Sequence, residues 1–308
     1  MASANANLHK AKDAKNDEFY TQLTDVSKEL MHYKQHFKNK IVFCNCDDPT
    51  WSAFWKYFHL NFSVLGLKKL ISTHYDKNNP TYKMEYTGGD DNNIEVGVKT
   101  PLEGNGDFRN QECLDLLDEA DIVVTNPPFS LFREYVAVLM EHNKKFLIIG
   151  NKNAVEYSEV FTPMKSNGLW MGYTSPSIFD TPNGLSKKVQ GLCRWFTNLD
   201  IEKRQEKIIM WKTYCEEEYP HYDYIDAIEV GKVADIPKDY DGIMGVPLTF
   251  MDSYNPEQFE IIDCTNGRYA ILDILKINED LRKNHRRICS INDVPKYARL
   301  LIRKKAGA

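Results

Sequence analysis

The chain has 308 residues and a mass of 35.7 kDa, which corresponds to one large domain or a core with a smaller appendage. Hydrophobic residues make up 42% and charged residues 27%, a composition typical of a folded globular protein that excludes disordered and fibrous classes. The 39 basic and 44 acidic side chains give a formal net charge of −5, so a nucleic-acid partner would require a locally basic face.

Nothing in the sequence indicates a membrane or an export route. Its apolar runs are far shorter than the roughly 20 residues that a membrane-spanning helix requires, and residues 1–7 lack the apolar segment of a secretory signal. We therefore expect a soluble, cytoplasmic protein. The 7 cysteines are an odd number without a metal or redox spacing, which predicts reduced thiols that mostly pack in the interior.

In the first two thirds of the chain, apolar runs of strand length alternate with amphipathic helical stretches. This alternation is typical of a parallel sheet covered by helices on both faces. In chain order we predict a strand at 40–46, a helix at 52–62, a strand at 68–73, a loop or short hairpin at 77–93, a helix at 112–119, a strand at 121–125, a helix at 131–142, a strand at 145–150, and a closing strand pair at 168–173 and 192–199 joined by a long loop at 174–190. The sequence therefore predicts an α/β fold with a doubly wound sheet.

Charge is unevenly distributed over the remaining third. Residues 281–308 carry nine Lys or Arg against the single acid Asp293, whereas residues 202–241 carry eleven acids and six bases. A basic cluster suits phosphate contacts, and the alternative is a solvated tail. Arg299 and Arg303, on a strand predicted at 298–305, are therefore candidates for contacts to a phosphate backbone.

The most specific motif is Asn126-Pro127-Pro128-Phe129, directly after the strand predicted at 121–125. Two prolines cannot continue a strand ladder, so the strand ends in a rigid turn at its carboxyl end, where α/β proteins bind ligands. The Asn126 side-chain carbonyl and the Pro127 backbone carbonyl are suited to accept hydrogen bonds from an exocyclic amine and to aim its lone pair at a methyl donor. Phe129 would stack on the base. The alternative is an ordinary Asn-Pro turn with Phe129 in the core.

The segment 121–132 (DIVVTNPPFSLF) resembles the catalytic motif of N6-adenine methyltransferases that use S-adenosylmethionine. The wider chain resembles the EcoRI-type adenine-specific DNA methyltransferase family through segments at 17–22, 42–49, 106–109, 195–200 and 236–259. They occur in the family's order, which is similar to that of the gamma class. The resemblance implies a Rossmann-like methyltransferase fold, S-adenosylmethionine as cofactor, and methyl transfer to a flipped adenine in duplex DNA. This chemistry needs no metal, and the histidines show no metal-binding spacing.

The resemblance also assigns residues to the cofactor site. Tyr20 and Thr21 match the N-terminal motif that lines the methionine part of the cofactor, and Asp107 and Phe108 match the motif that holds its adenine. The remaining candidates follow predicted strands: Asn45, Asp47, Asp48 and Pro49 after the first, Tyr75 and Asp76 after the second, and Asn126 within the catalytic motif. The choice between Tyr75 and Asp76 for the ribose stays open, and Asp48 has the alternative of capping the next helix.

Trp195 and Phe196, in the closing strand pair, are candidates for the second stacking face of the target base, with burial in the core as the alternative. We expect an S-adenosylmethionine-binding catalytic domain at 1–200 and a target-recognition and DNA-binding region at 201–308. We also expect a monomer, and we leave open a cognate restriction endonuclease that acts on the same site without a stable complex.

Three other functions share parts of this pattern. An RNA adenine methyltransferase also uses the NPPF motif, and a protein-glutamine methyltransferase uses a similar one because its acceptor is an amide. A catalytically silent DNA-binding protein would keep the cofactor fold and bind DNA with a salt-dependent affinity. The match of the C-terminal segments favours the DNA adenine methyltransferase.

Overall fold

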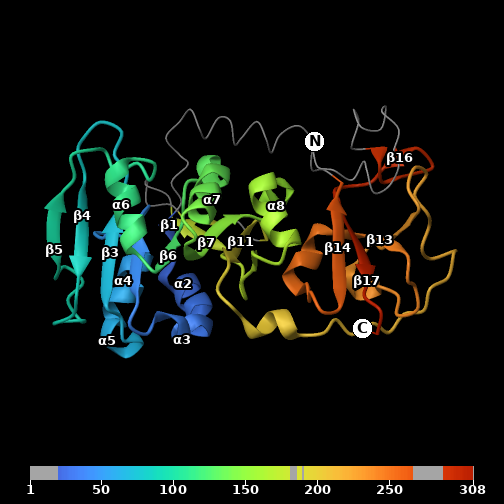
Figure 1. Cartoon of the computed structure of the whole chain (residues 1–308), viewed down its shortest axis with the longest axis horizontal. Coiled ribbons are helices and arrows are strands. Elements are labelled where there is room, and N and C mark those ends of the chain that lie inside the picture. Colours follow the sequence, from blue (N-terminus) through green and yellow to red (C-terminus); the bar gives the residue numbers. More distant parts are fainter. Residues whose placement is uncertain (1–19, 181–185, 189–190, 266–286, 308) are drawn as a thin grey trace. The chain divides into compact units, whose positions relative to one another are not determined.

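The computed structural model describes residues 20–180, 186–188, 191–265 and 287–307. The chain forms two compact units, one from residues 1–152 and 171–200 and the other from residues 153–170 and 201–308. Each unit has its own β-sheet (Figure 1). Every helix among the described residues is too short or too polar to pass through a bilayer.

An eight-stranded sheet forms the centre of the first unit, in the order β5-β4-β3-β2-β6-β7-β11-β8. Its strands are β2 (Ile41–Cys44), β3 (Lys69–Thr73), β4 (Tyr82–Tyr86), β5 (Val98–Pro101), β6 (Ile122–Thr125), β7 (Lys145–Asn151), β8 (Trp170–Met171) and β11 (Cys193–Thr197). The four central strands β3, β2, β6 and β7 are parallel, whereas β4, β5 and β11 pair antiparallel. All residues of β2 and β6 are buried, as strands covered on both faces require.

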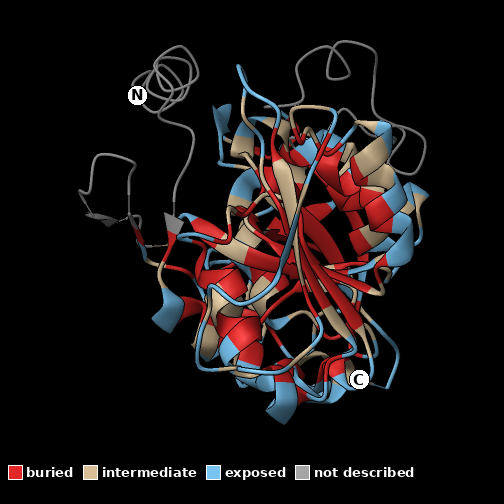
Figure 2. Ribbon diagram, turned by 90° about the vertical axis from the view of Figure 1, so that its left-hand side faces the viewer, coloured by how far each residue is buried: buried red, intermediate tan, exposed pale blue. Residues whose placement is uncertain are grey.

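Helices cover both faces of this sheet. Their bounds are α2 (Leu23–Leu30), α3 (Lys34–Phe37), α4 (Ala53–Leu60), α5 (Phe62–Leu65), α6 (Gln111–Glu119) and α7 (Phe132–Glu141). Because α4 connects β2 to β3 and α7 connects β6 to β7 in the opposite direction along the sheet, right-handed crossovers put these two helices on opposite faces. Figure 2 shows the buried residues along the strands and on the helix sides that face them. The predicted α/β fold is thus confirmed, with a mixed rather than an all-parallel sheet.

The structure places strands in two connecting segments: 77–93, which was predicted as a loop or short hairpin, and 174–190, which was predicted as a long loop. The stretch at 77–93 contains β4, whose Tyr86 is buried and stacks on His59 with ring centroids 3.8 Å apart. The long loop expected at 174–190 contains β9 (Ile178–Asp180) and β10 (Ser186–Lys188), which pair antiparallel. With β1 (Tyr20–Thr21) these strands form a three-stranded sheet, so the expectation of an irregular loop is wrong for this part.

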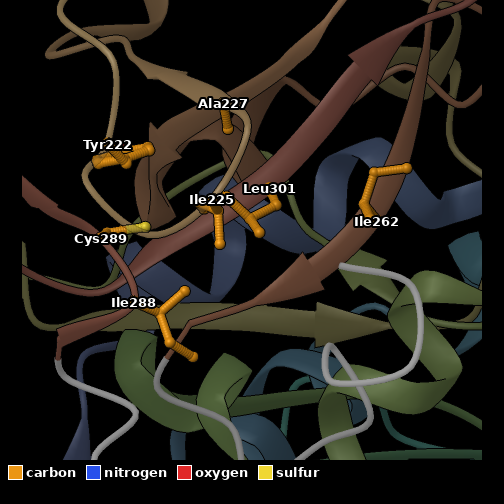
Figure 3. Packing of buried hydrophobic residues seen from close by; sticks show 7 residues of the cluster. All are labelled: Tyr222, Ile225, Ala227, Ile262, Ile288, Cys289 and Leu301. Carbon is orange, nitrogen blue, oxygen red and sulfur yellow. The ribbon is translucent and has the colours of Figure 1, made fainter. Parts of the chain in front are cut away.

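The second unit is built on a four-stranded sheet in the order β12-β13-β17-β14. Its elements are α8 (Ser158–Lys165), β12 (Ala227–Glu229), β13 (Ile243–Pro247), β14 (Phe259–Cys264), β15 (Ser290–Ile291), β16 (Val294–Pro295) and β17 (Arg299–Lys304). The strand predicted at 298–305 is β17. A cluster of buried side chains packs around the sheet (Figure 3), formed by Tyr222, Ile225, Ala227, Ile262, Ile288, Cys289 and Leu301. All the cysteines are free thiols, and most are buried, as predicted.

Candidate functional site

A cavity of about 370 Å³ lies in the first unit, lined by the segments that directly follow β2, β3 and β6. The chain leaves β2 toward β3 and leaves β6 toward β7, so the strand order reverses between β2 and β6, where open α/β sheets bind their ligands. The volume lies within the range of about 300–1,000 Å³ that is typical of small-ligand sites. Its wall is formed by residues 45–48, 74–76, 106–109 and 126–129, together with Thr21, Trp51, Ala53, Phe54 and Leu131.

Asp47 is the most deeply buried acid in this wall, with 3% of its surface exposed. Its Oδ1 accepts a hydrogen bond from Ser52 Oγ at 2.9 Å, and its Oδ2 accepts one from Thr125 Oγ1. The backbone N–H of Asn126 also donates to this carboxylate. Burial raises the pKa of Asp47 to about 7, against the opposing effect of these hydrogen bonds. The carboxylate therefore joins the loop after β2 to the end of β6.

Asp48 is held by a local turn and by β4. Its Oδ1 accepts hydrogen bonds from the Thr50 N–H at 2.9 Å and from the Tyr82 hydroxyl at 3.0 Å, and its Oδ2 lies 3.7 Å from His74 Nε2. Ser52 caps α4, because its Oγ accepts two backbone N–H groups of the first turn. Asp48 therefore lines the cavity, and the alternative that it caps the helix is wrong.

Two polar atoms of the wall are buried and lack a hydrogen-bond partner among the residues that the structure describes: Thr21 Oγ1 and His74 Nδ1. Leaving such an atom unsatisfied costs about 1–3 kcal/mol. Thr21 is brought to the wall by β1, where it pairs with Phe179 of β9. By contrast, Asn45 Oδ1 accepts a hydrogen bond from the Tyr135 hydroxyl. Tyr20 pairs in β1, but its side chain lies outside the described part of the chain.

Tyr75 and Asp76 both line the cavity at the end of β3. The Asp76 carboxylate accepts a hydrogen bond from the Asn78 N–H at 2.8 Å, and such backbone and side-chain donors lower the pKa of Asp76, which keeps it ionised at neutral pH. Gly106 lies beside this segment with φ +73°, and a Cβ there would come within 2.0 Å of the His74 carbonyl oxygen. Only glycine permits this close approach of the two loops.

Asp107 is fixed by Arg109. Its Oδ1 accepts a hydrogen bond from Arg109 Nε at 2.9 Å, and its Oδ2 accepts one from Arg109 Nη2 at 2.7 Å. These hydrogen bonds lower the pKa of Asp107. Arg109 Nη1 also contacts Glu134 Oε2 at 2.9 Å. The Phe108 ring is 5% exposed and packs edge-on against Tyr135, with centroids 5.0 Å apart. This segment therefore presents an ionised carboxylate beside an aromatic ring.

The NPPF motif forms the wall that follows β6. All four residues, Asn126, Pro127, Pro128 and Phe129, line the cavity. Phe129 begins a short 3-10 helix, η2 (Phe129–Leu131), and its ring lies edge-on to Phe179 with centroids 6.5 Å apart. The structure thus brings the motif together with the predicted cofactor residues that follow β2, β3 and β5.

A model of the family described as adenine-specific methyltransferase EcoRI matches residues 7–305 of the chain. The chain belongs to the EcoRI-type adenine-specific methyltransferase family. It is 42% identical to the Type II methyltransferase M.EcoRI of Escherichia coli, over 98% of both chains. It is also 40% identical to M.MgeORF184P of Mycoplasma genitalium and 39% identical to M.MpnI of Mycoplasma pneumoniae, each over 97% of this chain and 98% of the relative. No solved structure was found to match.

Membership of the EcoRI-type family confirms the predicted enzyme class, an adenine-specific methyltransferase of the kind found in restriction-modification systems. It also implies a methyl donor of the S-adenosylmethionine type. The NPPF motif and most of the residues that the resemblance assigned to the cofactor line the same cavity.

Among the residues predicted for the cofactor or the target base whose side chains the structure describes, Pro49, Trp195 and Phe196 do not line the cavity. Pro49 is buried next to the wall residue Asp48. Trp195 and Phe196 of β11 are fully buried in the core, where Trp195 packs edge-on against Phe54 with centroids 5.9 Å apart. The structure therefore gives these two aromatic residues a packing role and does not bring them to the NPPF turn.

The two arginines of β17 differ in their surroundings. Arg299 is 12% exposed in its side chain and binds Glu229 through Nε at 3.0 Å and Nη2 at 2.5 Å. Burial alone would lower the pKa of Arg299, but the hydrogen bonds and the charge of Glu229 raise it. Arg299 is thus engaged in a buried ion pair, which argues against the predicted phosphate contact. The Arg303 side chain is 46% exposed, 3.8 Å from Glu260, and remains accessible to an anion.

Sequence reasoning missed several wall residues. His74 directly follows the strand predicted at 68–73, so its position was a usable signal. Arg109 lies inside the segment at 106–109 that carried the family resemblance, and Trp51 lies two residues after the segment at 42–49, but neither was singled out. Phe54 and Leu131 reach the wall from α4 and η2, and no sequence signal distinguishes them from core residues.

Proposed function

We propose that this protein is a sequence-specific DNA N6-adenine methyltransferase that transfers methyl from S-adenosylmethionine to an adenine flipped out of duplex DNA. The observation that carries the proposal is the position of the NPPF turn, which lines one cavity together with Thr21 and with acids that follow three different strands. The names of the relatives, all Type II methyltransferases, support a role in a restriction-modification system.

The residues of the wall fit S-adenosylmethionine. Thr21 Oγ1 and His74 Nδ1 are buried polar atoms that a ligand would satisfy. We assign the ribose hydroxyls to Asp76, because its ionised carboxylate is an acceptor fixed by the turn that follows it. Asp107 and Phe108 offer an acceptor and a ring face for the adenine of the cofactor. When bound, S-adenosylmethionine supplies a methyl group attached to a sulfonium sulfur. This sulfur leaves readily, as a neutral thioether.

The NPPF turn acts on the target adenine. The exocyclic nitrogen of adenine is a poor nucleophile because its lone pair is delocalised into the ring. The Asn126 side-chain carbonyl and the Pro127 backbone carbonyl would accept its two N–H groups and direct the lone pair toward the cavity. Phe129 would stack on the base, and its edge-on contact with Phe179 would hold the ring in place.

The test is transfer of labelled methyl from S-adenosylmethionine to unmethylated genomic DNA, with structured RNA as competitor. We expect label in adenines of DNA at one short sequence motif, and no label in RNA. Label in RNA or in protein would identify one of the alternative methyltransferases. Cofactor binding and salt-dependent DNA binding without any transfer would identify a silent DNA-binding protein.

Arg303 is expected to contact a DNA phosphate. The Arg303→Ala protein should bind specific and non-specific duplexes more weakly to a similar extent, with the slope of log K against log salt reduced by about 1. Fluorescence anisotropy over a salt series measures this slope. Lys207→Ala, an exposed cation in the acid-rich stretch, is the matched control and should leave the slope unchanged. Equal slopes for the parent and Arg303→Ala would remove Arg303 from the DNA interface.

We further propose that the enzyme acts as a cytoplasmic monomer. A cognate endonuclease would share its DNA site without forming a stable complex, because methylation requires only that each enzyme reads the same sequence. Sedimentation of the enzyme with and without its DNA site tests this oligomeric state. A monomer should bind one duplex per chain.

A further inference from the structure

We propose that Asp47 is a positioning residue that fixes the catalytic NPPF turn to the loop after β2. This inference rests on the proposed function, since the turn is catalytic only in an enzyme that methylates an amine. In the proposal Asp47 acts through Asn126 and does not contact the target base. Its role is thus distinct from that of a cofactor ligand, which was the role implied by the family resemblance.

The carboxylate of Asp47 accepts hydrogen bonds from the segment after β2 and from the end of β6, the two strands between which the strand order reverses. In the segment after β2, Ser52 Oγ donates to Oδ1 of Asp47 at 2.9 Å. From the side of β6, Thr125 Oγ1 donates to Oδ2, and the backbone N–H of Asn126 donates to the same carboxylate. Thr125 is the last residue of β6, and Asn126 is the first residue of the motif. Asp47 therefore holds the turn at the residue that would carry the acceptor for the amine.

Asp47 is itself fixed to the neighbouring strand. Its backbone N–H donates to the Thr73 carbonyl at 2.9 Å, and its carbonyl accepts a hydrogen bond from Ser72 Oγ. Both partners are buried residues of β3. Asp47 thus links β3, through its backbone, to the turn after β6, through its carboxylate, and these two parts of the sheet are not adjacent. A link of this kind fixes the distance from the cofactor loops to Asn126.

The hydrogen bonds to the Asp47 carboxylate predict the effect of replacing Asp47 with asparagine. An ionised carboxylate offers about four lone-pair sites, and three are occupied here by protein donors. Asp47→Asn replaces one acceptor oxygen by an NH2 group that faces a donor, so one of these contacts is lost. The turn would then shift, and a displacement of about 1 Å in a reacting group can reduce the rate about 10²-fold.

The decisive experiment measures kcat, KM for DNA and the Kd of S-adenosylmethionine for four variants. Asp47→Asn and Thr125→Val are each expected to lower kcat about 10²-fold, with the Kd of the cofactor close to that of the parent. Thr125→Ser keeps the hydroxyl and should recover most of the activity lost in Thr125→Val. The double variant Asp47→Asn/Thr125→Val should lose little more than either single variant, because both remove the same contact.

The pH profile separates positioning from a purely structural role. Because burial raises the pKa of Asp47 to about 7, ionisation of its carboxylate should increase kcat as the pH rises from 6 to 8, and this step should vanish in Asp47→Asn. Cys44, Cys46 and Tyr135 also face the carboxylate, but burial raises the pKa of each well above its ordinary value, so they stay neutral over this range. Asp48 is the remaining acid nearby, and Asp48→Asn should keep the step.

Two results would overturn the inference. If Asp47→Asn weakens cofactor binding and leaves kcat unchanged at saturation, Asp47 is a cofactor ligand. If Thr125→Val is as active as Thr125→Ser, the link to the turn has no catalytic effect, and this pair remains informative even if Asp47→Asn fails to fold. Both results require an active parent enzyme, so they are distinct from failure of the proposed function, in which the parent itself transfers no methyl group.

Discussion

Replacing Asn126 with alanine should lower kcat for methyl transfer about 10²–10³-fold, the usual effect of removing one hydrogen-bonding group from a site that stabilises a transition state. The side-chain carbonyl would accept an N–H group of the target amine, and alanine has no atom that replaces it. Asn126→Asp keeps an acceptor but adds a charge to the cavity wall, so its kcat should lie between those of the parent and Asn126→Ala. Single-turnover transfer of labelled methyl to a duplex with one target site measures these rates.

Two controls accompany the Asn126 variants. Thermal unfolding should show that Asn126→Ala keeps its fold, since Asn126 lies in a turn after the buried strand β6. Binding of DNA without transfer should remain measurable for both variants. An Asn126→Ala protein that methylates as fast as the parent would exclude the proposed role of the NPPF motif.

The second large effect is expected in the other unit, where Glu229 and Arg299 form a buried ion pair. Glu229→Gln should lower the free energy of unfolding by about 3–5 kcal/mol, because it leaves the guanidinium buried without its anionic partner. The side chains of Arg299 and Glu229 are only 12% and 11% exposed, so water has little access to replace the lost contact. Tyr222, whose hydroxyl donates to Glu229, would lose an ionised acceptor as well.

The matched control for Glu229→Gln is Glu260→Gln. Glu260 of β14 pairs with Arg303, which lies on β17 as Arg299 does. This pair is 3.8 Å apart, and 55% of the Glu260 side chain is exposed. Such surface pairs contribute about 0–1 kcal/mol. Urea unfolding followed by fluorescence and circular dichroism measures both variants. Equal losses of stability in the two variants would show that the buried pair has no special role.

The central strands of the fold were predictable because each is a short apolar run buried on both faces. The strands predicted at 40–46, 68–73, 121–125 and 145–150 correspond to β2, β3, β6 and β7. By contrast, most residues of β4 are only half-buried, so this strand has no apolar signal to oppose the Asn and Gly residues that follow it. Its position depends on pairing with β3, which a local pattern does not reveal.

The residues of the candidate site also differ in whether a local sequence pattern reveals their position. Residues that lie one to three positions after predicted strands, such as Asp47, Asp76 and Asn126, line the cavity because parallel strands bring their carboxyl ends to one edge of the sheet. Arg299 could not be assigned in this way. Its partner Glu229 is 70 positions away, and nothing in the sequence around Arg299 distinguishes a buried ion pair from a phosphate contact.

The pairing of β1 with β9 has a consequence for the synthesis of this enzyme. Thr21 reaches the cavity wall because it pairs with Phe179, and the ring of Phe179 lies edge-on to Phe129 of the NPPF motif. A nascent chain that ends before β9 therefore lacks the strand that holds Thr21 at the cavity wall, even if the central strands have already formed. At about 5–20 residues per second, the interval between synthesis of Thr21 and of Phe179 is of the order of ten seconds or longer. During translation, the growing polypeptide should thus have an incomplete cavity until β9 has emerged from the ribosome.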